Sequence, residues 1–160
     1  MSARLLAAAL LAGLPAAAAG EGIREHIEAE LARYGRVLAD ARVQIAVDDD
    51  AVLLRGTVRF YRQRMIYEQV AWRAPGVREV ENELQVVPQL PVSDAEIERR
   101  IVEIAKLGRF QGAGLQATVR DGMVAVSGTF HEPADVFVLK HRLAEIEGVR
   151  GIAITASFAV

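Results

Sequence analysis

The residue types that most often carry catalysis or hold metals are few in this chain, and they do not converge in the sequence. There are three histidines, His26, His131 and His141, and no cysteine. No pair has the His-x-x-x-His spacing of ligands on one helix, whereas a zinc site needs three or four convergent ligands. Ser127 precedes Gly128, but the G-x-S-x-G turn of a nucleophilic serine is absent. We therefore expect no enzyme active site, no metal site and no cofactor.

Two further segments resemble ligand-binding loops only in composition. Residues 48–50 are three consecutive aspartates, but they lack the alternating ligands, central glycine and distal glutamate of a calcium loop. Residues 108–114 are rich in glycine, but they lack the Lys-Ser/Thr pair of a phosphate-binding loop. We interpret the first as a hairpin turn and the second as a connection between a helix and a strand.

Two predicted helices, residues 61–74 and 133–146, carry apolar residues outside their core-facing stripe. In the second helix the stripe recurs at intervals of three and four residues, at Val136, Leu139, Leu143 and Ile146. Because an α-helix turns by about 100° per residue, Phe137 points away from that stripe. The same rotation places Met65 and Trp72 on the corresponding outer side of the first helix.

Basic residues neighbour these outer side chains along the sequence. They are Arg62, Arg64 and Arg73 in the first helix, and Lys140 and Arg142 in the second. Aromatic and apolar residues beside basic ones are typical of a membrane interface or of a surface that binds a partner. The alternatives are that they fill the interface between the two halves of the chain, or that they are scattered exposed apolar residues. The predicted lipid or partner contacts are Met65, Trp72, Phe137, Lys140 and Arg142.

The two helices belong to a pattern that occurs twice. Residues 40–78 align without a gap over residues 112–150, so that the apolar runs 52–58 and 124–130 coincide, each with Gly-Thr near its end. Each copy contains an amphipathic helix, two alternating strands, a second helix and a last strand opened by Gly-Val-Arg. This order predicts an α+β protein with two tandem α-β-β-α-β modules. We expect Gly56 and Gly128 to permit a special backbone shape or close packing.

The boundaries of the modules follow from turn and capping signals. Residues 88–92 contain two prolines and are expected to form a stiff, extended linker between a first module at residues 20–87 and a second at residues 93–160. Ser93 and Glu96 have the spacing of a helix capping box, and Asp121-Gly122 is a strong hairpin signal. Because the linker is short, we expect the modules to pack against each other.

The first 19 residues have the order of a secretory signal peptide. Arg4 is followed by an apolar run at residues 5–14, then by Pro15 and an A-x-A cleavage site within residues 16–19. The run is short for a membrane span, and Leu14 stands where a lipoprotein would need a cysteine. We expect a cleaved signal, no lipid anchor and no integral membrane span in the mature chain. The formal net charge of −2 argues against a nucleic-acid partner.

The repeated pattern resembles the BON domain. The features that carry the resemblance are the acidic or Asp-Gly turn, the apolar strand ending in Gly-Thr, and the Gly-Val-Arg opening of the last strand. Residues 77–84 resemble the closing stretch of that family in particular, whereas the second copy has Ile154 where the first has Asn82. Two copies after a signal peptide are similar to the layout of the osmotically inducible periplasmic proteins.

The resemblance carries expectations about fold and function. It implies a small three-stranded sheet in each module, with two helices packed on one face. It also implies a non-catalytic periplasmic protein that binds an anionic phospholipid surface in envelope maintenance or osmotic stress. The alternative is an adaptor or periplasmic chaperone that binds envelope proteins without binding lipid.

Overall fold

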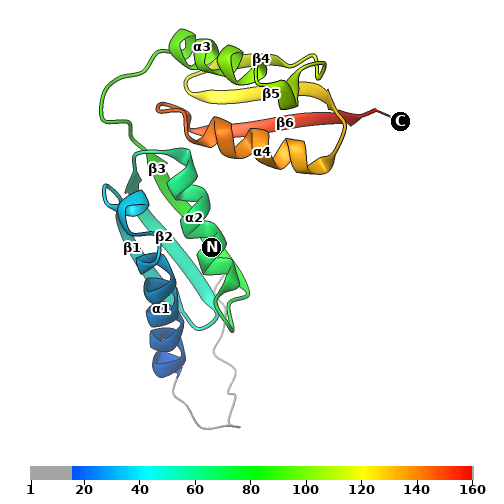
Figure 1. The fold of residues 1–160 in the computed structure, drawn as a ribbon. Helices are drawn as coiled ribbons and strands as arrows, with labels where there is room; N and C mark the ends of the chain where they lie inside the picture. Colours follow the sequence, from blue (N-terminus) through cyan, green and yellow to red (C-terminus); the bar gives the residue numbers. More distant parts are fainter. Residues whose placement is uncertain (1–15, 160) are drawn as a thin grey trace, which may run out of the picture.

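The computed structural model describes residues 16–159 and shows two modules that follow each other along the chain (Figure 1). The first module consists of α1 (Ala16–Ala32), the short 3-10 helix η1 (Gly35–Leu38), β1 (Arg42–Asp48), β2 (Ala51–Val58), α2 (Tyr61–Arg73) and β3 (Glu79–Val86). The second consists of α3 (Asp94–Ala105), the 3-10 helix η2 (Gly108–Phe110), β4 (Gln116–Arg120), β5 (Met123–Phe130), α4 (Pro133–Ala144) and β6 (Gly151–Phe158). The predicted α-β-β-α-β order is confirmed in both modules.

Each module contains one three-stranded sheet whose middle strand follows the hairpin turn. The orders are β1-β2-β3 and β4-β5-β6. The first two strands of each sheet are antiparallel, and the third runs parallel to the second because a helix carries the chain back between them. In the second module Asp121 and Gly122 both have positive φ, at 50° and 76°, as a tight hairpin turn requires. Asp94 at the start of α3 accepts hydrogen bonds from the backbone N–H groups of both turn residues.

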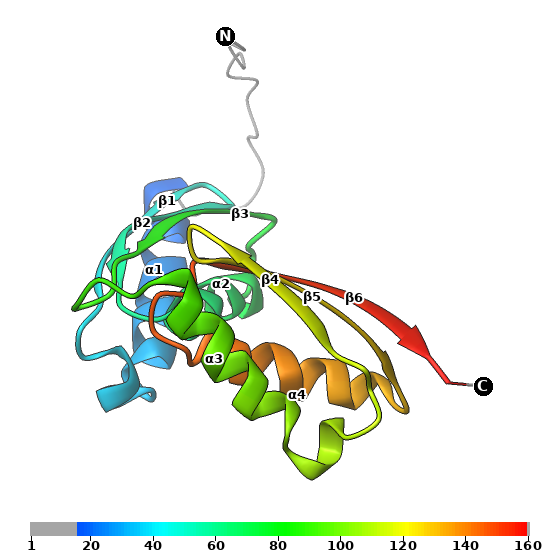
Figure 2. The same cartoon turned by 90° about the horizontal axis from the view of Figure 1, so that it is seen from above.

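Each sheet buries one face under its two helices, as expected. Ile27 and Leu54 are fully buried in the first core, and Ile97 and Leu139 are fully buried in the second. Figure 2 shows α3 and α4 side by side on one face of the second sheet. The two cores are separate clusters, and Tyr61 at the start of α2 packs against both of them.

Several element boundaries differ from the predictions. Helix α1 begins at Ala16, within the predicted signal segment, of which residues 1–15 lie outside the described residues. Helix α2 ends at Arg73, because Ala74 precedes a proline and adopts an extended conformation with ψ of 132°. The backbone N–H of Glu96 donates to Ser93 Oγ as predicted. The Glu96 carboxylate instead pairs with two arginines of α3, so only half of the expected capping box forms.

The two glycines of the Gly-Thr repeats have different structural reasons. Gly56 has φ of +130°, and a Cβ added there would collide with the backbone carbonyl of Arg42. Gly128 has no such φ, but a Cβ would lie 2.6 Å from the Leu115 side chain and 3.0 Å from the carbonyl oxygen of Ala113. The first position therefore needs both a special backbone shape and close packing, whereas the second needs only close packing.

Candidate functional site

Helix α2 is positioned by the side chain of Gln63, which is 3% exposed. Its Oε1 accepts hydrogen bonds from the backbone N–H groups of Arg59 and Phe60, at 2.8 and 3.0 Å. Its Nε2 donates to the carbonyl oxygen of Val37 at 2.7 Å. Because each of these buried polar groups has a partner, the start of α2 is held firmly against the end of β2 and against η1.

Helix α2 has two apolar sides. One side is buried against the first sheet and carries Ile66, Tyr67, Val70 and Ala71. The other side carries Tyr61, Met65 and Trp72, which recur at helical spacing. Met65 is partly buried, whereas Trp72 is 50% exposed. The expected outer stripe of α2 is therefore real, and its C-terminal end is open to solvent.

Helix α4 presents a similar outer side. Leu139 and Leu143 are buried against the second sheet, whereas Phe137 is 63% exposed. The ring of Phe137 lies 4.2 Å from the ring of His141, centroid to centroid, with an angle of 51° between the planes. This contact between residues one turn apart holds the aromatic ring in place on the helix surface.

These two outer sides face each other and form a groove, which we call the α2–α4 groove. It has a volume of about 390 Å³. Its walls include Tyr61, Met65 and Trp72 from α2, and Phe137, Lys140 and His141 from α4. Four of the five predicted contact residues therefore come together, although they are far apart in the sequence. The residues lie between the modules, as the interface interpretation predicts. Two of the aromatic side chains nevertheless remain exposed, as the contact interpretation predicts.

The fifth predicted residue, Arg142, lies elsewhere. It lines a separate groove between α3 and α4, together with Arg100 and Leu107. Successive residues of a helix point about 100° apart, so Arg142 and His141 face different neighbours. Arg142 is therefore placed apart from the other four predicted contact residues.

Two of the basic residues predicted to accompany the aromatic side chains serve as structural contacts. Arg62 lies 2.5 Å from Glu145 and so joins α2 to the end of α4. Arg64 donates to the backbone carbonyl of Asn82 in β3 at 3.0 Å. Lys140 is exposed at the α2–α4 groove, and Arg73 is exposed at the end of α2. Glu68 also lines the groove, so both signs of charge are present there.

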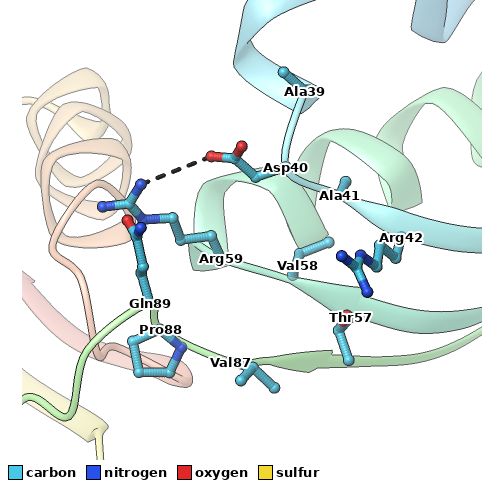
Figure 3. A pocket seen from close by; sticks show the side chains of 10 residues that line it. All are labelled: Ala39, Asp40, Ala41, Arg42, Thr57, Val58, Arg59, Val87, Pro88 and Gln89. Atoms are coloured by element: carbon cyan, nitrogen blue, oxygen red, sulfur yellow. Dashed lines mark ion pairs between the residues drawn. The ribbon is translucent and has the colours of Figure 1, made fainter.

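A larger hollow lies where the first module meets the linker (Figure 3). It has a volume of about 580 Å³ and lies among residues 39–41, the start of β1, the end of β2 and residues 87–89. Figure 3 shows Arg59 reaching across it toward Asp40, with an ion-pair distance of 3.7 Å. Arg59 also binds Glu147 of the second module. We interpret this hollow as part of the junction between the modules, because the Arg59 side chain that crosses it already pairs with Asp40 and Glu147.

The first module is similar to a known protein family. A protein-family model described as "BON domain" matches residues 20–88. The first module is a BON domain. The matched range contains the whole βαβ unit that presents Met65 and Trp72, so one wall of the α2–α4 groove belongs to the BON domain. The second module repeats its sheet order and strand directions.

Other comparisons identify distant similarities. No curated protein matches the chain. The chain is similar to a solved structure of the C-terminal domain of CdsD, "the structural protein of the Type III secretion system of Chlamydia trachomatis". The identity is 9%, the TM-score is 0.40, and the alignment covers 85% of this chain and 96% of that one. A second CdsD structure matches with 10% identity, a TM-score of 0.30, and coverage of 86% and 92%.

The described part of the chain offers surfaces for binding. Among residues 16–159 no group of three or more histidine, aspartate or glutamate side chains is placed to hold a metal ion. The same residues include no helix that is both long and apolar enough to cross a bilayer. The α2–α4 groove can offer a ligand apolar contact with exposed aromatic rings. The amine of Lys140 and the carboxylate of Glu68 lie at its margin.

Proposed function

We propose that this protein binds an anionic phospholipid surface non-catalytically through the α2–α4 groove. The observation that carries the proposal is the joint exposure of Trp72 and Phe137 on facing helices of two modules, beside Lys140. Aromatic rings favour the interfacial region of a bilayer, where an apolar body and a polar edge are both accommodated. A lysine near the surface adds attraction to anionic headgroups. The BON domain in the first module supports the proposal, because that family is linked to phospholipid binding in envelope proteins.

Trp72 provides a direct test, because it is the single tryptophan of the chain. The purified protein is titrated with vesicles of phosphatidylcholine alone and of phosphatidylcholine with phosphatidylglycerol, at low and high salt. If the proposal holds, the Trp72 emission shifts to shorter wavelength and the protein co-sediments with the anionic vesicles. The binding weakens as salt rises, because the electrostatic part of the attraction is screened.

Matched variants separate the groove from general adsorption. Phe137→Asp introduces a charge on the wall opposite Trp72 and is expected to abolish co-sedimentation while Trp72 remains available as the probe. Val102→Asp is the control, because Val102 is 54% exposed on α3 and does not line the α2–α4 groove. Equal binding by the two variants, or no binding of the unchanged protein to anionic vesicles at low salt, would refute the lipid proposal.

A second candidate function is the binding of an envelope protein in the same groove. The observation that favours it is the mixture of Glu68 and Lys140 around a concave apolar surface, which suits a complementary side chain better than a flat membrane. Partly exposed Met65 adds an adaptable contact of the kind found in protein-binding grooves. Negative vesicle experiments combined with a Phe137-dependent complex in a pull-down from envelope extract would favour an adaptor. Suppression of client aggregation would identify a chaperone.

Three further aspects of the sequence interpretation belong to this proposal. We propose that the second module is a further BON module, because its sheet repeats the topology and the register of the first. We also propose that the protein is exported to the periplasm and that residues 1–19 are removed. N-terminal sequencing of the protein recovered from a periplasmic fraction tests this, and a mature terminus that retains residues 5–14 would contradict it.

A further inference from the structure

The two modules differ at the outer edge of their sheets. Strands β3 and β6 occupy equivalent edges, next to β2 and β5 respectively. Among the described residues, no strand lies along the outer side of either one. An edge strand presents unpaired backbone donors and acceptors, which can receive a strand from another chain unless the edge is protected.

The edge of β3 is protected by its own module. Arg64 of α2 donates to the backbone carbonyl of Asn82 at 3.0 Å. The Asn82 side chain accepts from the backbone N–H of Leu84 at 3.2 Å and donates to Glu68 at 2.9 Å. These contacts occupy outward backbone groups of β3. The exposed side chains Glu79, Glu81 and Glu83 add negative charge along the same strand.

Among the described residues, the edge of β6 has no such protecting hydrogen bonds or charges. Ile154 stands in place of Asn82, and Val136 stands in place of Arg64. The strand Gly151–Phe158 contains no charged residue and no proline. The other two edge strands each carry charge, with Arg42 and Asp48 in β1 and Arg120 in the short β4. Within residues 16–159, the outer edge of β6 is therefore the one that remains open to pairing.

The backbone groups available on β6 can be identified from one hydrogen bond. The N–H of Ala159 donates to the carbonyl oxygen of Phe130 at 3.1 Å, so residue 159 faces β5. In a parallel ladder, alternate residues bond toward the neighbouring strand and the others point away. The outward residues are therefore Ile152, Ile154, Ala156 and Phe158. Figure 2 shows β6 at the margin of its module, with its C-terminal end directed away from the first module.

We infer that two copies of this chain associate through antiparallel pairing of β6 with β6, around a two-fold axis at Thr155. This register places Ile154 opposite Ala156 of the second copy, and Ile152 opposite Phe158 of the second copy. These are apolar pairs on the face that carries α4, where Phe158 is 48% exposed in the single chain. The equivalent arrangement of β3 would place Glu83 beside Glu83 and is disfavoured by repulsion. The pairing is closed, because each copy uses its one open edge.

The absence of cysteine from the chain permits a sharp test. At the axis Thr155 faces its own copy as a pair without direct hydrogen bonds, in which the Cα atoms lie about 4.5 Å apart. A disulfide accepts Cα separations of about 4.4–6.8 Å. Thr155→Cys is therefore expected to form a covalent dimer under mild oxidation. Ala125→Cys is the control, because Ala125 is exposed on the same sheet face but lies in the central strand beside Ala153.

A second measurement uses the unmodified interface. Sedimentation over a concentration series is expected to show the protein approaching twice the mass of one chain. Thr155→Glu should leave it monomeric, because two glutamates would meet at the axis, and Ala125→Glu should not. Circular dichroism verifies that both variants fold. A single-chain mass at all concentrations, or equal crosslinking of the Thr155→Cys and Ala125→Cys variants, overturns the inference.

Discussion

Arg59 and Glu147 join the two modules through a bidentate ion pair. Arg59 Nε lies 2.9 Å from Glu147 Oε1, and Arg59 Nη2 lies 3.2 Å from Oε2. The backbone N–H of Gln89, in the linker, donates to the same Oε1 at 2.9 Å. The hydrogen bond from Arg59, followed by that from Gln89, lowers the pKa of Glu147 below its ordinary value. The carboxylate thus fixes the second module to both the first module and the linker.

Acidification is expected to loosen this junction. Because the pKa of Glu147 is lowered in the folded protein, its contribution is present above the ordinary carboxyl pKa and is lost as the pH falls through the lowered value. X-ray scattering should record a larger radius of gyration at low pH. Glu147→Gln should show the expanded value already at neutral pH. Glu145→Gln, which removes the more exposed contact to Arg62, is the control and should change the radius less.

Replacing the two repeat glycines by alanine should have unequal effects. Gly56→Ala is expected to destabilise the first module by about 1–3 kcal/mol, because it forces a side chain into the left-handed region and against the Arg42 carbonyl. Gly128→Ala should cost less, because the nearest atom belongs to the flexible Leu115 side chain. Denaturant unfolding of both variants provides the measurement. Equal losses of unfolding free energy would show that alanine at position 56 causes no more strain than alanine at position 128.

Removing the Asn82 side chain should weaken the contact between β3 and α2. Asn82→Ala leaves the N–H of Leu84 and the carboxylate of Glu68 without this partner. The expected loss is about 1 kcal/mol of unfolding free energy, the typical net value of an intramolecular hydrogen bond. Gln85→Ala, at an exposed position of the same strand, is the control. A loss no larger than that of the control would show that Asn82 is not a structural link.

Truncating a buried leucine should affect one module much more than the other. Leu139→Ala is expected to lower the stability of the second module by about 2–5 kcal/mol, because Leu139 is fully buried. Among the residues that the structure describes, the two cores are separate and share only Tyr61 at their boundary. Hydrogen exchange should therefore accelerate in β5 and α4 more than in β2 and α2. Uniform acceleration in both modules would instead show that they unfold as one unit.

The sequence determined the local order of the molecule. Helical spacing at residues 136–146 and the alternation of the strands in each copy depend only on neighbouring residues, so the elements could be predicted before any contact was known. The Asp121-Gly122 turn was also predictable, because positive φ at both positions favours these residue types. The ends of helices were less predictable. Their last turns depend on local competition, such as the extended conformation of Ala74 before Pro75.

The apolar stripes on the outer sides of α2 and α4 could be predicted from the sequence. That the two stripes face each other could not. Helical rotation alone places Met65, Trp72 and Phe137 away from the core-facing stripe. Whether they are buried between modules or exposed depends on the angle at which the modules pack. That angle is set by contacts between distant residues, notably Arg59 with Glu147 and Arg62 with Glu145. The sequence contains no periodic signal for such pairs.

What the sequence by itself determined was therefore the duplication, the order of elements in each copy and the identity of the outward-facing residues. The order of elements and the outward-facing residues follow from patterns within about a dozen neighbouring residues. The duplication follows from the gapless alignment of residues 40–78 with residues 112–150. Only the tertiary structure decided that Lys140 joins the groove and Arg142 does not, and that the edge of β3 is protected while that of β6 is open. The physical reason is that grooves and sheet edges form between elements far apart in the chain, where side-chain packing and charge pairing fix the geometry.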